Sequence, residues 1–206
     1  EIVKMAYDFS GYRVEVEYFP WARAVTEARK GEIFDGIFPP WKTEEREAWF
    51  LYSEPLFPSV IGFYKRKNIN IRFTNYEALK PYIIGAVIGY ANPPGFDAAD
   101  LQKVNVMLDS QNMGMLCMGH LDMVLVDKIV GRHLINQNYP TCIYEIDWME
   151  PALEFKYMYV AISRKAKYAH EKRDAFNRGL RIIKGNGEFD RIIKKHHLTD
   201  VLEAEL

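Results

Sequence analysis

The stretch Asp35-Gly-Ile-Phe-Pro-Pro-Trp-Lys-Thr-Glu-Glu-Arg-Glu47 decides how the first part of the chain folds. It begins in a short apolar run, Ile33–Phe38, which is typical of a buried strand. Two prolines then end the strand, because proline has no backbone N–H to donate to a sheet. Thr43 is a good N-cap residue for the charged segment that follows it. The stretch therefore predicts a strand, a rigid junction and the start of a helix.

The residues before this stretch predict three further elements. Apolar positions at helical spacing indicate a helix from Ile2 to about Ser10, the alternating segment Tyr12–Phe19 favours a strand, and Ala22–Lys30 is expected to be a helix. A strand normally precedes the first helix of an α/β unit, so we expect that an upstream strand is missing from this sequence.

After a strand over Val60–Tyr64 and a polar break at Lys65–Asn68, the same pattern restarts. Further strands are expected at 83–87, 104–108, 123–126 and 157–162, and helices at 75–79, 97–101, 111–119, 128–136, 168–184 and 188–196. The order predicts an α/β protein of two lobes with mixed sheets: residues 1–64 and 156–206 form lobe 1, and residues 65–155 form lobe 2. Clefts between lobes are a usual place for small ligands.

Composition excludes several classes of protein. The 206 residues are 49% hydrophobic and 27% charged, as in ordinary soluble globular proteins. A net charge of −1 provides no basic field for nucleic acid or an anionic membrane. No apolar run reaches the ~18–20 residues of a membrane span, and no cleavable signal is visible, so the chain is expected to be cytoplasmic or already processed. Phosphate-loop, nucleophile-elbow and zinc-protease motifs are absent, and neither a cofactor nor a metal is expected.

The two cysteines, Cys117 and Cys142, are too few and too far apart for a zinc site or a redox pair. Cys117 lies among Met115, Leu116 and Met118 on an expected helix, which favours the role of a small buried hydrophobe. A single disulfide between the two cysteines is left open by the sequence.

Arg46 is the first candidate for ligand binding. A guanidinium can hold a carboxylate through two parallel hydrogen bonds, which a lysine cannot imitate. The alternative is a surface arginine paired with Glu45 or Glu47. The place of Arg46 just beyond a strand favours binding, because ligands of open α/β sheets lie outside the carboxyl ends of the strands.

Asp127 is the second candidate, because it ends the apolar run Met123–Val126. Its carboxylate could accept hydrogen bonds from a ligand ammonium group, or it could cap the helix that begins at Lys128. Arg46 and Asp127 together would complement the two charges of an α-amino acid. Trp21, Trp41 and Tyr90 also follow strands, where an aromatic face can either cover an apolar ligand group or simply pack in the core.

Several motifs in sequence order resemble those of the family 3 extracellular solute-binding proteins, the periplasmic receptors of polar amino acid ABC transporters. They run over almost the whole chain: Lys30-Gly-Glu-Ile-Phe-Asp-Gly-Ile, Lys42-Thr-Glu-Glu-Arg-Glu, Tyr52-Ser-Glu-Pro-Leu-Phe, Ile84-Gly-Ala-Val-Ile-Gly-Tyr, Gly119-His-Leu-Asp-Met-Val-Leu-Val-Asp, Phe176-Asn-Arg-Gly-Leu and Gly187-Glu-Phe-Asp-Arg-Ile. The resemblance implies a type II periplasmic binding fold, with two α/β lobes and a ligand cleft that closes on binding.

The resemblance also implies roles for individual residues. Arg46 would bind the ligand carboxylate and Asp127 its amino group. Further contacts would come from Trp21, Gly89, Tyr90 and Ala91. Pro39, Pro40 and Trp41 stand where relatives commonly carry Ser, Thr or Gly, and the two prolines remove N–H donors that other members use.

These features predict a monomeric, non-enzymatic periplasmic binding protein for an amino acid or a related zwitterion, with an inner-membrane permease as its partner. Two alternatives stay open. The first is a sensory input domain of a receptor, which the acidic tail Asp200–Leu206 does not favour. The second is an enzyme similar to the cyclohexadienyl dehydratases, with Glu44, Glu45 or Glu54 as acid or base.

Overall fold

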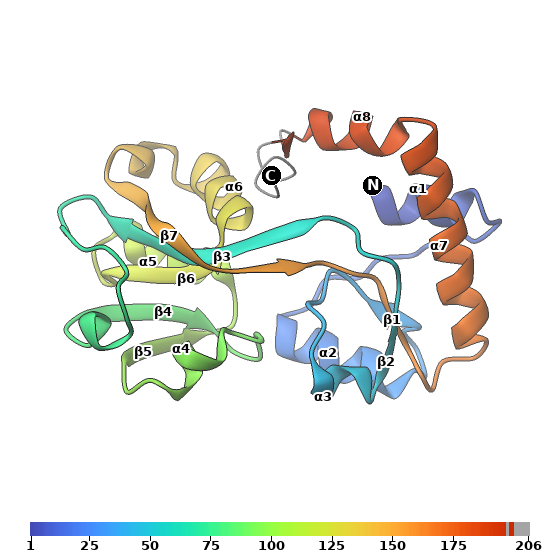
Figure 1. Ribbon diagram of the computed structural model, residues 1–206, viewed down its shortest axis with the longest axis horizontal. Helices are drawn as coiled ribbons and strands as arrows, with labels where there is room; N and C mark the ends of the chain where they lie inside the picture. The colour runs from blue at the N-terminus through green and yellow to red at the C-terminus, as the bar shows by residue number, and fades with distance from the viewer. Residues whose placement is uncertain (197, 200–206) are drawn as a thin grey trace. The chain divides into compact units, whose positions relative to one another are not determined.

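The computed structural model describes residues 1–196, 198 and 199 (Figure 1). His197 and the predicted acidic tail, residues 200–206, lie outside these residues. The chain divides into two compact units. Unit 1 contains residues 1–19, 23–58 and the chain from 157 onward, and unit 2 contains residues 20–22 and 59–156.

Unit 1 combines a small sheet with several helices. Its helices are α1 (Ile2–Asp8), α2 (Trp21–Lys30, from residue 23 on), α3 (Glu44–Glu47), α7 (Ala169–Gly185) and α8 (Glu188–Lys195). Its strands are β1 (Gly36–Ile37), β2 (Phe50–Tyr52) and β8 (Ala161–Ser163), in the order β1-β8-β2. Both neighbouring pairs are antiparallel, with Ile37 opposite Ala161 and Leu51 opposite Ile162.

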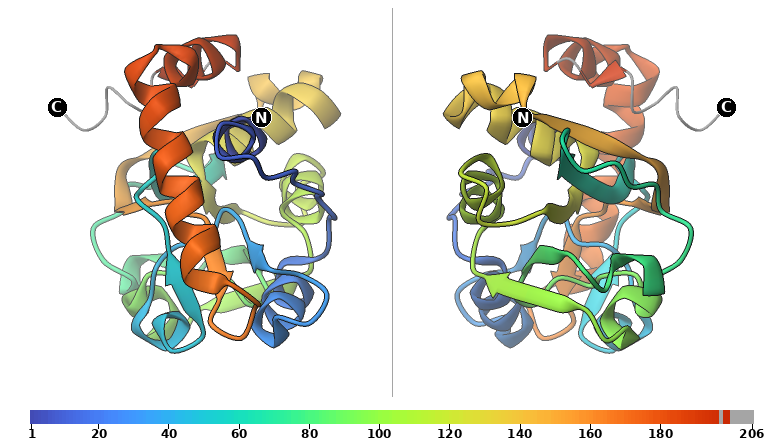
Figure 2. Two further views of the ribbon diagram at one scale, coloured as in Figure 1. Left: turned by 90° about the vertical axis from the view of Figure 1, so that its right-hand side faces the viewer. Right: turned by 90° about the vertical axis from the view of Figure 1, so that its left-hand side faces the viewer.

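The core of unit 1 lies where α1 and α8 pack against α7. Ala6 of α1 and Phe176, Leu180 and Ile183 of α7 are completely buried there. The long helix α7 crosses α1 (Figure 1), and the side view of this unit shows α1 nearly end-on beside α7 (Figure 2). Gly179 permits this crossing, because a Cβ at that position would overlap the Ala6 carbonyl. The apolar face predicted for the 168–184 helix is therefore the face that forms the core.

Unit 2 is built on a five-stranded mixed sheet. Its strands are β3 (Pro58–Arg66, from residue 59 on), β4 (Ile83–Val87), β5 (Gln102–Val106), β6 (Met123–Asp127) and β7 (Ile146–Tyr157, up to residue 156), in the order β5-β4-β6-β3-β7. Its helices are η1 (Glu77–Leu79), α4 (Pro94–Ala98), α5 (Asp109–Cys117), α6 (Lys128–Asn138) and η2 (Pro140–Tyr144). Strands β5, β4 and β6 are parallel, and β3 runs antiparallel to β6.

A disulfide joins Cys117, at the end of α5, to Cys142 in η2, with a Cα–Cα distance of 5.7 Å. The role of a small buried hydrophobe, which the sequence favoured for Cys117, is therefore wrong, and the disulfide that the sequence left open is formed. Cys142 is buried in the core of unit 2, and Cys117 packs against that core from its partly exposed position. The bond closes a covalent loop that holds α6 and β6 between its two ends.

The strand expected at 12–19 is not part of any sheet. Its side chains alternate as in a strand, with Tyr12, Val14 and Val16 half-buried and the residues between them exposed. No backbone hydrogen bond joins Arg13–Phe19 to another described residue. The segment has the side-chain pattern of a strand but lacks a neighbour with which to form a ladder.

Two other expected strands have clearly different bounds from those predicted. The strand expected at 33–38 is reduced to Gly36–Ile37. The strand expected at 157–162 is divided between the end of β7 and β8. Between these strands the Met158 N–H donates to the Phe57 carbonyl, the Met158 carbonyl accepts from the Leu56 N–H, and the Tyr159 N–H donates to the Pro40 carbonyl. Strand β2 and most of β7 were not predicted from the sequence.

Candidate functional site

The first group of candidate residues lies in unit 1, after β1. Thr43 caps α3, and its hydroxyl accepts from the Arg46 N–H at 3.3 Å. This capped turn directs the Arg46 side chain inward, where only 6% of the residue is exposed. Arg46 is therefore a buried cation rather than the surface arginine that was the alternative interpretation.

The carbonyl oxygen of Trp41 holds the Arg46 guanidinium. It accepts from Arg46 Nη1 at 3.2 Å and from the Tyr52 hydroxyl at 3.4 Å. Burial lowers the pKa of Arg46, an effect that Tyr52 and Glu45 partly oppose. Burial also raises the pKa of Tyr52 to about 12, so the phenol is neutral and acts as a donor. A carboxylate placed on this guanidinium would offset the cost of burying its charge.

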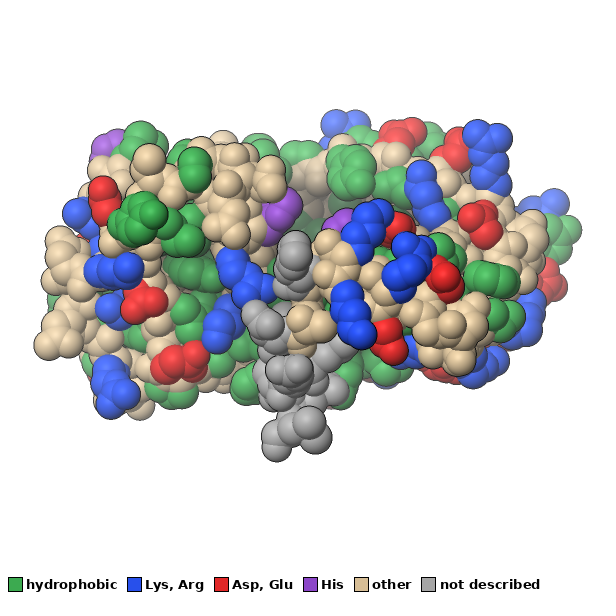
Figure 3. Space-filling model, turned by 90° about the horizontal axis from the view of Figure 1, so that it is seen from above, with side chains coloured by type: hydrophobic (Ala, Val, Ile, Leu, Met, Phe, Trp, Pro, Cys, Tyr) green, Lys and Arg blue, Asp and Glu red, His purple; other side chains and the backbone are tan. Residues whose placement is uncertain are grey.

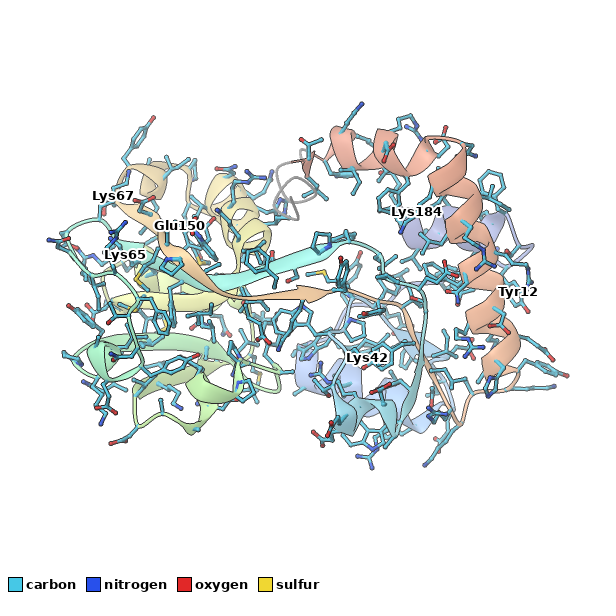
Figure 4. All side chains as sticks on the ribbon, in the orientation of Figure 1. Tyr12, Lys42, Lys65, Lys67, Glu150 and Lys184 are labelled. Atoms are coloured by element: carbon cyan, nitrogen blue, oxygen red, sulfur yellow. A yellow bond between two sulfur atoms is a disulfide. The ribbon has the colours of Figure 1, made fainter. Side chains whose placement is uncertain are left out.

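Pro39, Pro40 and Trp41 form the junction between β1 and α3. Pro39 is exposed and Pro40 is buried, and the Pro40 carbonyl accepts from the Tyr159 N–H at 3.2 Å. Trp41 forms a bridge with Met158. These contacts fix the backbone of the junction, so the Trp41 carbonyl is held in place to receive Arg46. Lys42, labelled in Figure 4, pairs instead with Glu47 at 2.7 Å on the surface.

The second group of candidate residues lies in unit 2, at the carboxyl edge of the parallel strands. Tyr90 follows β4, Asp109 follows β5 and Asp127 ends β6. Because the three strands are neighbours and run in the same direction, the residues that follow them come out on one edge of the sheet. This edge is where small ligands of α/β sheets bind.

Asp127 is 5% exposed and its carboxylate is already engaged. Oδ1 accepts from the N–H groups of Ile129 and Val130 at 2.8 and 3.0 Å, and Oδ2 accepts from the Ser59 hydroxyl at 2.5 Å. Asp127 is thus the N-cap of α6, one of the two roles that the sequence left open. A carboxylate offers about four lone-pair sites, so the capping bonds leave room for one more donor.

Tyr90 joins this edge through a hydrogen bond from its hydroxyl to Asp109 Oδ2 at 2.5 Å. Burial is the main reason that the pKa of Tyr90 is raised, and Asp109 raises it further. Burial also raises the pKa of Asp109 to about 6, with the Tyr90 hydrogen bond acting against it and the negative charge of Asp127 acting with it. Two carboxylates that influence each other in this way favour the approach of a cation.

The remaining predicted residues lie close to Tyr90. Trp21 packs edge-on against the Tyr90 ring, with 5.9 Å between ring centroids. Gly89 has a φ of +81°, which a side chain would strain, and a Cβ there would lie 3.0 Å from Ala22. The Ala91 carbonyl accepts from Lys156 Nζ at 3.1 Å. In unit 2 the structure therefore brings four of the predicted residues, Trp21, Gly89, Tyr90 and Ala91, into one neighbourhood.

Tyr52, Ser59 and Asp109 were not among the residues predicted from the sequence. Ser59 had a signal, since it is a single hydroxyl inside the apolar run of β3, and such groups need a partner when buried. Asp109 also had a signal, since it directly follows the strand predicted at 104–108, as Asp127 follows the apolar run Met123–Val126. Tyr52 had no signal, because its role depends on a carbonyl eleven residues away.

The glutamates considered for an enzymatic role do not form an acid–base pair. Glu44 and Glu45 are exposed, and Glu54 pairs with Arg181.

Within residues 1–196, 198 and 199, no group of three His, Cys, Asp or Glu side chains could hold a metal ion. In the face of unit 1 seen in Figure 3, basic and acidic side chains are interspersed rather than gathered by sign. None of the helices in the described part of the chain is long and apolar enough to cross a membrane.

The model of the bacterial extracellular solute-binding proteins, family 3, matches residues 1–199. The chain belongs to this family. It has the α/β type II periplasmic binding protein fold, as the resemblance implied. None of the curated proteins matches the sequence.

Solved structures share this fold at low sequence identity. The amino acid ABC transporter substrate-binding protein AbpA from Streptococcus pneumoniae Canada MDR_19A, bound to L-arginine, matches with a TM-score of 0.80 and 16% identity over 97% of this chain and 83% of its own. The GluR0 ligand-binding core from Nostoc punctiforme, in complex with L-glutamate, gives 0.81 and 17% over 96% and 89%. A histidine kinase sensor domain gives 0.78 and 16% over 94% and 82%.

Proposed function

We propose that this family 3 solute-binding protein binds an amino acid or a closely related zwitterion and delivers it to an ABC permease in the inner membrane. The observation that carries the proposal is the pair of buried, opposite charges at matching positions of the two units. Arg46 follows a strand of unit 1 and Asp127 ends a strand of unit 2, and both are held in place by contacts with the main chain. In this proposal the guanidinium binds the ligand carboxylate and Asp127 accepts from its ammonium group.

Burial gives each of these charges an energetic reason to bind a ligand. A ligand group of opposite charge interacts more strongly with a buried ion than with an ion at the exposed surface, because the surroundings screen the attraction less. Charge-assisted hydrogen bonds are also shorter and about twice as strong as neutral ones. A zwitterion supplies both partners in one molecule. The L-arginine and L-glutamate held by two of the similar structures support an amino acid as the ligand class.

The aromatic and proline residues would shape the rest of the ligand's surroundings. Trp21 and Tyr90 offer ring faces near Asp109 and Asp127. Pro39 and Pro40 offer no N–H, so a ligand carboxylate would depend on Arg46 for its donors on that side. We therefore propose that Arg46 contributes more to carboxylate binding here than in a protein with free amides at those positions.

Thermal denaturation in the presence of amino acids, organic acids and polyamines tests the proposal. A ligand that binds only the native state at 100 times its Kd stabilises that state by about 2.7 kcal/mol, which is easily detected as a higher Tm. We expect at least one free amino acid to raise the Tm, and its N-acetyl derivative, which lacks the ammonium charge, not to do so. Stabilisation by organic acids alone would contradict the role given to Asp127.

A sensory input domain is the second candidate, because a histidine kinase sensor domain shares the fold. The ligand contacts would be the same in both cases. The periplasmic location, the monomeric state and the permease partner are part of the transport proposal only. Co-purification of a permease with the tagged protein in the presence of ligand would favour transport, whereas a membrane-spanning segment and a kinase encoded in frame beyond residue 206 would favour the sensor.

A further inference from the structure

Asp109 is an acidic residue of unit 2 to which the proposed function gives no role. It is the first residue of α5, just beyond the end of β5. The Tyr90 hydroxyl donates to its Oδ2 at 2.5 Å. Its other oxygen, Oδ1, is buried and makes no hydrogen bond to another described residue. A buried carboxylate oxygen without a partner costs stability, so folding alone does not account for an aspartate at this position.

The first turn of α5 holds the backbone of Asp109 in place. The side-chain oxygen of Gln111, Oε1, accepts from the N–H groups of Met107 and Leu108, at 3.1 Å in each case. The Leu108 carbonyl accepts in return from the Gln111 N–H, also at 3.1 Å. These bonds fix the residues on both sides of Asp109, so its carboxylate is presented by a rigid part of the unit.

Tyr90 reaches Asp109 from the turn that follows β4. Its N–H donates to the Val87 carbonyl at 3.3 Å, which fixes the backbone of the turn. Its ring packs against the Trp21 ring edge-on. The hydrogen bond to Asp109 acts on the far end of the side chain, and so it selects one direction of the ring among the rotamers that the turn allows.

We propose that Asp109 is a positioning residue of the amino acid site, which holds the Tyr90 ring in the orientation that contacts the ligand and does so when its carboxylate is ionised. The inference rests on the proposed function, because Tyr90 is one of the residues proposed to contact the ligand. An ionised acceptor makes a shorter and stronger hydrogen bond than a neutral one. A protonated Asp109 therefore holds the ring less firmly, and the site is then less well organised for binding.

The ionisation of Asp109 links this positioning to pH. Tyr90 faces the carboxylate from the turn after β4, and Asp127 influences it from the end of β6. Burial is the main cause that raises the pKa of Asp109 to about 6, while the Tyr90 hydrogen bond opposes this shift and the charge of Asp127 adds to it. The ionised fraction is then about a tenth at pH 5 and about nine tenths at pH 7. If only the ionised form holds the ring, ligand affinity rises about tenfold between these pH values, because the apparent Kd is the intrinsic Kd divided by the competent fraction.

Calorimetry on the full chain tests the inference. The standard L-amino acids are first screened by thermal shift at pH 7, and those that bind are titrated at pH 5, 6 and 7. The parent should bind about tenfold more tightly at pH 7 than at pH 5, whereas the affinity of Asp109→Asn, which has no charge to lose, should change by less than about threefold. Asp97→Asn is the matched control, because Asp97 is an exposed aspartate of unit 2 that bonds to Asn92. This variant should keep the pH profile of the parent.

The outcomes separate this inference from the proposed function. The same pH profile in the parent and in Asp109→Asn would overturn the positioning role and leave amino acid binding in place. If none of the amino acids binds, the proposed function fails, and the role of Asp109 fails with it. Without ligand, the NMR signal of the Tyr90 Cζ carbon should shift with a midpoint near pH 6 in the parent and stay constant in Asp109→Asn. A constant signal in the parent would also overturn the inference.

A double-mutant cycle at pH 7 shows whether Asp109 acts through Tyr90. Asp109→Ala and Tyr90→Phe should each weaken binding, and the double variant should bind no more weakly than the weaker of the two single variants. Asp109→Asn should recover part of the affinity that Asp109→Ala loses, because its amide oxygen still accepts from the Tyr90 hydroxyl. Additive losses would overturn the proposal, since Asp109 would then act by itself, for example through its interaction with the N-terminus of α5.

Discussion

The Ser59 hydroxyl donates a 2.5 Å hydrogen bond to Asp127 Oδ2, and both residues are almost completely buried. Ser59 lies on β3, two residues before Ile61, which pairs with Asp127 across the sheet. The bond therefore ties the start of one strand to the end of its antiparallel neighbour. It holds the carboxylate in one orientation while Oδ1 caps α6, which is the preorganisation that a binding residue requires.

Two substitutions separate the capping role of Asp127 from the proposed binding role. Asp127→Ala should lower the free energy of unfolding by about 1–2 kcal/mol for the lost cap and by about 0.5–1.5 kcal/mol for the lost hydrogen bond from Ser59. Asp127→Asn should lower it less, because Asn caps helices about as well as Asp. Denaturant unfolding measures both effects. Calorimetry should then show weak amino acid binding by the Asn variant, and full affinity in that variant would leave Asp127 as a cap alone.

Arg46→Ala should abolish most of the ligand affinity. Removing one partner of a buried charge pair costs about 2–5 kcal/mol, so the Kd should rise roughly 30-fold or more. Lys42→Ala is the matched control, since this cation lies on the same loop but pairs with Glu47 at the surface. Arg46→Lys should restore little affinity, because an ammonium group lacks the two-pronged geometry. An Arg46→Ala protein with normal affinity and normal Tm would refute the carboxylate role.

Asp109 should make stability depend on pH. Its pKa is raised from 3.8 to about 6 in the folded protein, so between these values the native state binds more protons than the unfolded state does. The free energy of unfolding should therefore fall as pH rises from about 4 to 6, by about 3 kcal/mol at 1.36 kcal/mol for each pKa unit. Asp109→Asn should remove this part of the pH dependence. Parallel unfolding curves at pH 4, 5, 6 and 7 for the two proteins provide the measurement.

The disulfide should stabilise unit 2. It joins residues 25 apart, and a bond of this span contributes about 2–4 kcal/mol, largely by restricting the unfolded chain. The double variant Cys117→Ser, Cys142→Ser should therefore have a lower Tm than the parent. Adding a reductant should lower the Tm of the parent and leave that of the variant unchanged. A parent Tm that does not respond to complete reduction would contradict this expectation.

Two glycines of α7 should respond in opposite ways to the same substitution. Gly179→Ala should destabilise the protein by about 1–3 kcal/mol, because the new methyl group meets the backbone of α1 at Ala6. Gly185→Ala adds the same methyl group where nothing lies within 4 Å, and it should stabilise the helix by up to about 1 kcal/mol. Denaturant unfolding of the two variants checks the pair, and a similar loss in both would mean that α1 does not pack closely at Gly179.

The sequence by itself determined the fold class and most elements of unit 2. Buried parallel strands such as Ile83–Val87 and Met123–Asp127 are continuous apolar runs, and residues like Thr43 and Asp127 mark helix starts through local capping. These signals are local in sequence, so they can be detected without knowing what packs against them. The pattern of strands and helices, which restarts after Lys65–Asn68, also predicted the two lobes, and the resemblance to the family then added the type II fold.

Tertiary structure decided what depends on contacts between residues far apart in the chain. Whether Tyr12–Phe19 becomes a strand depends on a neighbour with which to pair, and its own alternating pattern cannot supply one. Whether Cys117 is free or bonded depends on where η2 places Cys142. Burial of Arg46, its bond to the Trp41 carbonyl and the link between Ser59 and Asp127 likewise arise only when separate segments pack together. The sequence thus determined which chemical groups are present. Packing decided which of these groups are buried and which partners they bind, because burial and pairing depend on segments that are far apart in the chain.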